Sequence, residues 1–130
     1  MSIQRVAQVF GIIFILAAVA GFVAPGGMGM EASHESAAKA LGIFPVNLLH
    51  NIVHLAFGVW GLIAAKSFGS AKSYATIGGA IYLLLAVLGF VAPDGFGLVP
   101  LGGNDIWLHL VLGGALLFFG ATAKSAQTAP

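Results

Sequence analysis

Charged side chains are scarce in this chain, and cysteine is absent. Five basic and four acidic side chains make up 7% of the 130 residues, whereas a soluble domain usually carries about 25%. So few charges cannot cover the surface of a water-soluble protein of this size, and five scattered cations provide no basic patch for nucleic acid. The absence of cysteine excludes disulfides, thiolate metal ligands, cysteine nucleophiles and the attachment of c-type haem.

Apolar residues take the place of the missing charges. Hydrophobic side chains make up 59% of the sequence, and the mean hydropathy is +1.03. A helix that crosses a bilayer needs about 20 consecutive apolar residues. Runs close to this length occupy residues 6–24, 45–65, 74–92 and 103–123. We therefore predict a single all-α membrane domain over residues 1–130, with four transmembrane helices.

The chain contains two similar segments. Residues 18–25 (AVAGFVAP) match residues 86–93 (AVLGFVAP) at an offset of 68. The pattern predicts two parallel helix-hairpin repeats, about 5–66 and 73–124, related by a pseudo-two-fold axis along the membrane normal. The first apolar run also resembles a signal peptide, but the recurrence of its last residues later in the chain argues against that interpretation. Further matches at an offset of 55 pair Gly42, Pro45, His54, Leu55 and Gly58 with Gly97, Pro100, His109, Leu110 and Gly113.

The charged residues predict the orientation of the helices in the membrane. Lysine and arginine next to short loops are retained on the cytoplasmic side. With four spans, one side of the membrane carries Arg5, Lys66, Lys72 and Lys124, and the other carries Glu31, Glu35, Asp94 and Asp105. Lys39 is the only cation expected on the acidic side. Both termini are therefore predicted to be cytoplasmic.

Polar residues and glycines follow one face of the second and fourth predicted helices. They recur at steps of three and four residues, which places them on a single stripe of each helix. Polar groups that face lipid are costly, so both stripes are expected to face the interior of the bundle. The stripes consist of Asn47, His50, Asn51, His54, Gly58 and Gly61 on the second helix and Asp105, His109, Gly113 and Gly120 on the fourth.

Superposition of the repeats places His50 opposite Asp105 and His54 opposite His109. Three imidazoles and one carboxylate are competent ligands for Zn, Fe or Mn, so these four residues are a candidate metal site. A structural role competes with this hypothesis, because intramembrane His, Asn and Asp also form interhelical hydrogen bonds worth about 0.6–2 kcal/mol each. In such a metal site, two asparagines would be available to hydrogen-bond the imidazoles and fix their tautomers, namely Asn51 and Asn104.

A tetrapyrrole site is a second interpretation of the same histidines. Gly58 and Gly113 follow His54 and His109 by four residues and share a helix face with them. Small residues there would leave a slot in which haem, held by both histidines, or a chlorophyll-type pigment, held by one, could lie. A bundle of four helices would have to splay to admit such a macrocycle.

No motif indicates catalysis. The serines lie in loops without a His–acid partner, and the Gly-Gly pairs lack the Lys and Ser/Thr of a phosphate loop. In the first loop, His34 with Glu31 and Glu35 is expected to form a solvated helical turn rather than a cation site. We therefore expect a protein that is not an enzyme.

Two segments resemble a bacterial family of small four-helix integral membrane proteins of unknown function. They are residues 45–55 (PVNLLHNIVHL), with the pattern N-x-x-H-N-x-x-H-L, and residues 104–110 (NDIWLHL), with the pattern N-D-x-W-L-H-L. The resemblance covers about residues 5–123 and implies a multi-pass protein of the bacterial inner membrane. It implies no activity, but it points to His50, Asn51, His54, Asp105, Trp107 and His109.

These observations favour a small integral membrane protein of structural or accessory type. It would lie in the lipid bilayer, pack with itself as a homo-oligomer or with a larger membrane complex, and bind no nucleic acid. The first alternative is a metal- or tetrapyrrole-binding protein in electron transfer or metal handling. The second is a proton or ion pathway through an oligomer.

Overall fold

The computed structural model describes residues 1–124 as a mostly helical protein. The prediction of four helices is confirmed, and three of them (α1, α3 and α4) are long and apolar enough to cross a membrane. The fourth, α2, is apolar but has only 17 residues. The elements in chain order are α1 (Ile3–Val23), β1 (Ala38–Ala40), β2 (Phe44–Val46), α2 (Leu48–Ala64), α3 (Phe68–Val91), the short 3-10 helix η1 (Gly95–Gly97) and α4 (Asp105–Thr122).

Short polar residues set the first turns of three helices. The side-chain oxygens of Ser2, Asn47 and Ser67 accept hydrogen bonds from backbone N–H groups three residues later, at 3.1, 2.9 and 3.3 Å. Such caps satisfy N–H groups that have no partner within the helix. Pro25 and Pro93 lie two residues beyond the last residues of α1 and α3, in agreement with the preference for proline just after a helix.

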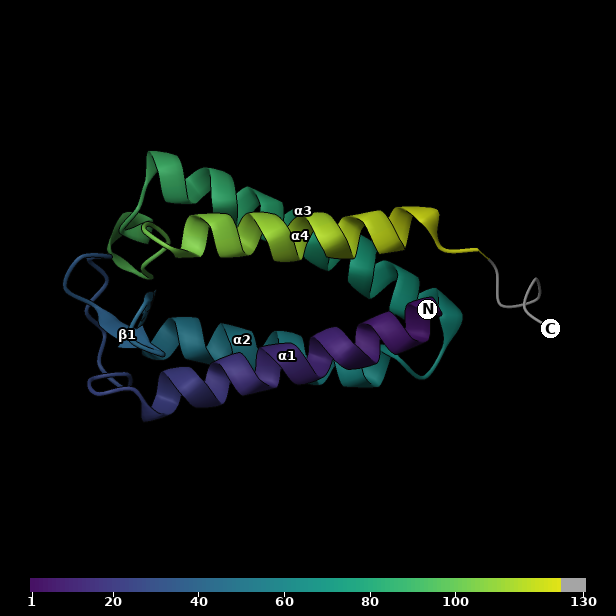
Figure 1. The fold of residues 1–130 in the computed structure, drawn as a ribbon, viewed down its shortest axis with the longest axis horizontal. Coiled ribbons are helices and arrows are strands. Elements are labelled where there is room, and N and C mark those ends of the chain that lie inside the picture. The colour runs from purple at the N-terminus through teal and green to yellow at the C-terminus, as the bar shows by residue number, and fades with distance from the viewer. Residues whose placement is uncertain (125–130) are drawn as a thin grey trace.

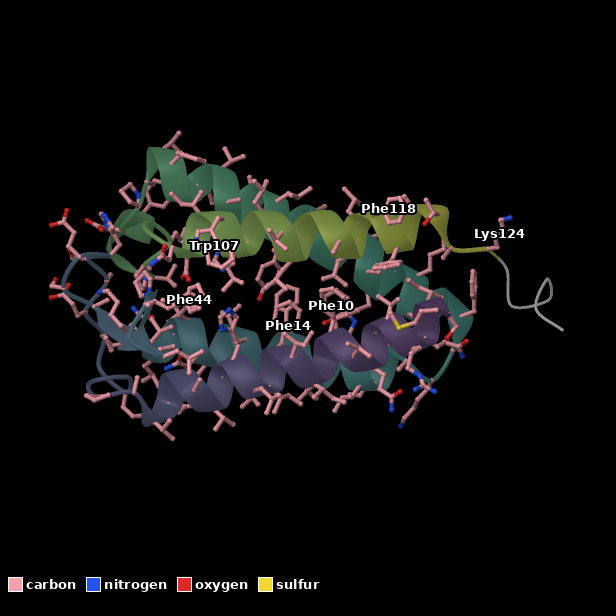
Figure 2. All side chains as sticks on the ribbon, viewed as in Figure 1. Phe10, Phe14, Phe44, Trp107, Phe118 and Lys124 are labelled. Atoms are coloured by element: carbon pink, nitrogen blue, oxygen red, sulfur yellow. The ribbon has the colours of Figure 1, made fainter. Side chains whose placement is uncertain are left out.

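The helices form two antiparallel pairs. The most extensive contacts join α1 to α2 and α3 to α4, and α1 also packs on α3 (Figure 1). The N-terminus lies at the end of the molecule opposite β1 (Figure 1), and Lys124 lies at that same end (Figure 2). Arg5 and Lys66 line one surface hollow there. The basic residues of the termini and of the α2–α3 connection therefore gather at one end of the bundle.

Glycines allow the helices of each pair to touch. A Cβ added to Gly58 on α2 would lie 2.8 Å from the carbonyl oxygen of Gly11 on α1. In the second pair, a Cβ on Gly113 of α4 would lie 2.9 Å from the carbonyl oxygen of Gly79 on α3. Only glycine permits such close approach of two backbones, which increases dispersion contacts between helices in lipid. The two crossings use residues that match at the offsets of 68 and 55.

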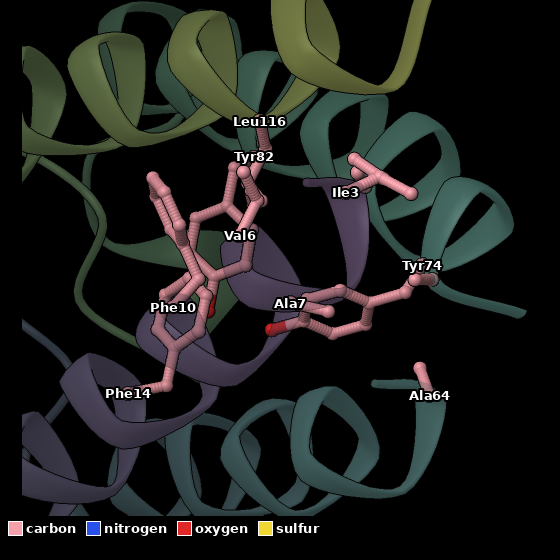
Figure 3. Close-up of a cluster of buried hydrophobic side chains, with 11 residues drawn as sticks. Ile3, Val6, Ala7, Phe10, Phe14, Ala64, Tyr74, Tyr82 and Leu116 are labelled. Carbon is pink, nitrogen blue, oxygen red and sulfur yellow. The ribbon is translucent and has the colours of Figure 1, made fainter. Parts of the chain in front are cut away.

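Aromatic side chains fill the interior toward the end of the bundle that carries the termini (Figure 3). Tyr74, Tyr82 and Phe14 are among the largest fully buried side chains. The Tyr74 hydroxyl donates a hydrogen bond of 3.0 Å to the carbonyl oxygen of Phe57, so its polar atom is satisfied within the bundle. This hydrophobic cluster holds α1, α2, α3 and α4 together. It lies between the end that carries the termini and the buried histidines of α2 and α4.

The first loop contains a small antiparallel sheet that the all-α prediction missed. Strands β1 and β2 pair with Ala40 opposite Phe44. The turn between them places Leu41 and Gly42 in the left-handed region, with φ values of 55° and 78°. Strands of three residues are too short to show alternating hydrophobicity, so no periodic pattern predicted them.

The same loop is tied to the loop between α3 and α4. His34 lies in a single turn, in which the N–H of Ala37 donates to the carbonyl oxygen of Ser33 at 2.8 Å. The backbone N–H of His34 donates to Asp94 Oδ1 at 2.8 Å. Its Nδ1 lies at the same distance from that oxygen. The ammonium group of Lys39 donates to three backbone carbonyls of this loop, at 2.8 to 3.3 Å.

Candidate functional site

The structure brings together all four residues predicted for the metal site. His50 and His54 lie one turn apart on α2, and Asp105 and His109 lie one turn apart on α4. All four are buried, with exposed fractions of 3%, 6%, 1% and 1%. We call these residues the His/Asp cluster.

The three histidines converge, whereas the carboxylate lies behind one of them. One ring nitrogen from each of His50, His54 and His109 lies within 4.8 Å of the others. The Nε2 atoms of His50 and His54 are 3.2 Å apart. Asp105 Oδ2 lies 3.5 Å from Nδ1 of His50, the nitrogen on the other side of that ring.

This spacing fits a common metal ion. Two nitrogens bound to one tetrahedral ion at about 2.0–2.1 Å are roughly 3.3 Å apart, close to the 3.2 Å between the two Nε2 atoms. A carboxylate at the opposite nitrogen of a ligating imidazole fixes the tautomer and the orientation of the ring. The spacing of His50 and His54 therefore suits two ligands of one ion, and His109 lies near enough to offer a third. Asp105 lies within ion-pair distance of the other nitrogen of His50.

Two aromatic rings pack against the His/Asp cluster on the side that faces the termini. Phe14 stacks on His54 with ring centroids 6.1 Å apart, and Tyr82 meets His109 edge-on at 5.2 Å. Phe14 and Tyr82 also stack on each other at 4.9 Å. The imidazoles are thus held in a largely apolar chamber, in which charged and polar groups interact more strongly than in water.

Most polar atoms of the cluster have no hydrogen-bond partner among residues 1–124. In folded proteins nearly all buried polar groups are paired, and an unpaired group inside a bilayer costs several kcal/mol. In this cluster the unpaired atoms lie together in the interior of the bundle. The buried atoms of the cluster concerned are Nδ1 of His50, Nδ1 of His54, both ring nitrogens of His109 and Oδ2 of Asp105. Outside the cluster, Oδ1 of Asn51 and the hydroxyl of Tyr82 also lack a partner among these residues.

The asparagines Asn51 and Asn104 hydrogen-bond loop carbonyls rather than the imidazoles. Asn51 donates to the carbonyl oxygen of Gly27 at 2.9 Å, and Asn104 donates to that of Ile43 at 3.0 Å. The amide N–H groups of Asn51 and Asn104 therefore bind loop carbonyls, and neither side chain hydrogen-bonds an imidazole in this structure. Amide side chains offer both donors and acceptors, and in a membrane protein loop carbonyls compete for them.

A further asparagine ties the two loops together. Asn47, the residue that caps α2, donates from its side chain to the carbonyl oxygen of Leu98 at 2.9 Å. Asn104, at the start of α4, donates in turn to the carbonyl oxygen of Ile43 in the first loop. Sequence reasoning placed Asn47 on the polar stripe but missed this link, because it depends on how the two loops meet. Trp107 lies outside the cluster and is 49% exposed.

The glycines predicted to flank a tetrapyrrole slot have other neighbours. Gly58 faces the backbone of α1 at Gly11, and a Cβ on Gly113 would lie 2.8 Å from the backbone nitrogen of Leu83 on α3. The space beside these glycines is filled by helix backbone, so no slot opens next to His54 and His109 at Gly58 and Gly113.

Two cavities adjoin the His/Asp cluster. One of about 370 Å³ opens between α1 and α4 and includes His54 and Asp105 in its lining. The other, of about 130 Å³, lies on the α2–α3 side and is lined in part by His50, His109 and Tyr82. Cavities therefore reach the cluster from two sides of the bundle, between α1 and α4 and between α2 and α3.

One comparison with known proteins gives a match. The family model described as "Domain of unknown function (DUF4383)" matches residues 4–122, which extend from the first turn of α1 to the last residue of α4 and include the whole His/Asp cluster. No curated protein and no solved structure matches the chain. Since the family model covers all four helices, the chain belongs to the DUF4383 family, a family of unknown function.

Proposed function

We propose that this protein is an integral membrane protein that binds a divalent transition-metal ion through His50, His54 and His109. The observation that carries the proposal is the convergence of three buried ring nitrogens within 4.8 Å of one another. Imidazole suits Zn, Cu, Fe and Ni, and the tetrahedral spacing of the His50 and His54 nitrogens favours Zn²⁺. A bound ion would act as a Lewis acid, while Asp105 holds the His50 ring in place.

A purely structural role, which the sequence favoured, has less support. Interhelical polar contacts would pair the histidines across the interface of α2 and α4. The 3.2 Å contact of His50 instead lies within α2, to His54, and neither nitrogen of His109 has a partner among the described residues. Among the residues that the structure describes, the contact across this interface within ion-pair distance is that of His50 with Asp105, at 3.5 Å.

An ion pathway and a tetrapyrrole site also have less support. A pathway to the end that carries the termini would have to cross the hydrophobic cluster around Phe14, Tyr82 and Tyr74 (Figure 3). A tetrapyrrole would need room beside Gly58 and Gly113, where helix backbone lies. Three convergent imidazoles, with neither a polar pathway to that end nor an open slot beside the glycines, favour metal binding. We infer a binding rather than a catalytic role.

We also infer that the bundle arose from two parallel hairpin repeats. Residues that match at fixed offsets meet in pairs between the hairpins, which is the signature of a local two-fold axis. The matched pairs in contact are Phe14 with Tyr82, His50 with Asp105 and His54 with His109. By the distribution of basic residues, we propose four membrane crossings with both termini in the cytoplasm. On the resemblance stated above, the membrane is the bacterial inner membrane. Self-association, or association with a larger complex, stays a prediction.

Elemental analysis of the detergent-purified protein tests the metal site. We expect near-stoichiometric metal in the wild type and in His34→Ala, a matched control in the first loop, and loss of that metal in His54→Ala. The same size-exclusion elution volume in all three proteins would show that the bundle is intact. A colourless wild-type protein without metal would overturn the proposal, and so would full metal occupancy in His54→Ala. A Soret band would replace it with a tetrapyrrole site.

A further inference from the structure

The larger cavity is a deep apolar groove between the two hairpins. Ile13, Phe14 and Ala17 of α1 line one wall, and Leu108 and Leu112 of α4 line the other. Residues of β1 and β2 and the turn between them close the end of the cavity near the loops, where Ala40 and Val46 are buried. The mouth is marked by Leu16, which is 62% exposed. Because the surrounding helices are apolar enough to lie in a bilayer, this mouth opens toward lipid.

The cavity exists because of two small residues. Ala17 and Ala20 line it on α1, whereas the matched positions on α3, at the offset of 68, are Leu85 and Leu88. Leu85 contributes to the wall of the smaller cavity on the opposite side of the bundle. The cavity lined by the two alanines measures about 370 Å³, and the one lined by Leu85 measures about 130 Å³. A leucine in place of Ala17 would close much of the larger space, and the second hairpin already accommodates one.

The inner end of the cavity is polar. Among residues 1–124, the polar side chains in its lining are His54 and Asp105, which are 6% and 1% exposed. Each has a buried atom without a hydrogen-bond partner among residues 1–124, namely Nδ1 of His54 and Oδ2 of Asp105. An imidazole N–H and a carboxylate together offer one donor and one acceptor. A hydroxyl group can donate to a carboxylate and accept from an imidazole N–H, whereas a hydrocarbon chain can do neither.

We propose that this cavity binds a lipophilic alcohol or phenol that enters from the bilayer. The apolar body would lie between α1 and α4, and the hydroxyl would donate to Asp105 and accept from His54. Cavities of roughly 300–1,000 Å³ with apolar walls and a few placed polar groups are typical of small-molecule sites. The proposal does not depend on the metal ion, since the volume is shaped by Ala17, Ala20 and the wall residues of α4.

Photolabelling tests both the site and the head group. The probe is nonylphenol with a diazirine in its alkyl chain, added to the protein in lipid nanodiscs, and labelled peptides are mapped by mass spectrometry. We expect labelling to concentrate on α1 between Ile13 and Ala20 and on α4 between Leu108 and Leu112. Unlabelled nonylphenol should compete. Its methyl ether, which cannot donate to Asp105, should compete about tenfold less well, as expected for the loss of one hydrogen bond.

A pair of leucine variants provides the control. Ala17→Leu should reduce labelling of α1 and α4 about tenfold, whereas Ala80→Leu, at an exposed position of α3 outside the cavity, should leave it unchanged. Metal content should be the same in both variants, which separates failure of this proposal from failure of the metal site. Label spread evenly over all lipid-facing helices, or unaffected by Ala17→Leu, would overturn the proposal. Equal competition by the ether would overturn it in favour of a lipid acyl chain.

Discussion

Phe14 and Tyr82 stack in the centre of the bundle with ring centroids 4.9 Å apart and ring planes inclined by 29°. Phe14 belongs to α1 and Tyr82 to α3, and the two positions match at the offset of 68. Above this pair, on the side of the loops, lie His54 and His109, and then His50 and Asp105, which match at the offset of 55. Three layers of matched residues thus meet where the two hairpins join.

The close glycine contacts predict a sharp difference between two adjacent residues of α4. A Cβ at Gly113 would lie 2.8 Å from the backbone nitrogen of Leu83 and 2.9 Å from the carbonyl oxygen of Gly79, whereas a Cβ at Gly114 meets nothing within 4 Å. Gly113→Ala should destabilise the protein by about 1–3 kcal/mol through overpacking. Gly114→Ala should be neutral or stabilising by up to about 1 kcal/mol, because alanine favours helix. Unfolding in detergent measures both changes, and equal stability of the two variants would contradict the helix crossing.

The position of Asp105 predicts an indirect role in metal binding. A carboxylate that orients a ligating imidazole typically contributes 10–100-fold to metal affinity. Asp105→Asn should therefore weaken binding by about that factor and keep the stoichiometry. Competition with a chromogenic chelator measures the affinity. Asp94→Asn, the same substitution in the loop between α3 and α4, is the control and should bind as the wild type does. Complete loss of metal in Asp105→Asn would instead indicate that the carboxylate is itself a ligand.

The absence of cysteine makes the topology directly testable. Ser36 and Gly69 are exposed at opposite ends of the bundle, in the first loop and in the first turn of α3. If both termini are cytoplasmic, a membrane-impermeant maleimide added to intact cells should label Ser36→Cys and spare Gly69→Cys. After permeabilisation both should react, and the wild type should give no background. Labelling of Gly69→Cys in intact cells would reverse the proposed orientation.

The contact between the loops predicts a dependence on pH. The side chain of His34, followed by its backbone N–H, holds the pKa of Asp94 below its usual value of 3.8. A lowered pKa in the folded state stabilises the protein fully above the pKa of the unfolded state, about 3.9. This contribution is lost as the pH falls through the lowered value. The Tm of the wild type should therefore exceed that of Asp94→Asn at neutral pH.

The difference in Tm between these two proteins should stay constant down to about pH 4 and disappear at lower pH. Thermal unfolding in detergent at a series of pH values measures it. A difference that persists or grows in strong acid would show that the ionised carboxylate of Asp94 is not what joins the loops.

Local features of the sequence were enough to predict much of this fold. Long apolar runs predicted the four helices, since hydrophobicity and helical period are properties of consecutive residues. The polar stripe predicted which side chains are buried, because polar groups avoid lipid. His50, His54, Asp105 and His109 could therefore be named from the sequence, and the structure brings them together. The short strands β1 and β2 were missed because three-residue strands carry no periodic signal.

Only the tertiary structure decided how these residues meet. Which nitrogen of His50 faces Asp105 depends on the rotation and depth of α2 against α4, which packing across the whole bundle determines. Asn51 and Asn104 bind loop carbonyls rather than imidazoles for the same reason. The volume beside Ala17 likewise requires both hairpins to be in place. Sequence determined what is buried, because burial follows from the chemistry of each residue. Structure determined what each buried atom contacts, because contacts depend on distances between segments far apart in the chain.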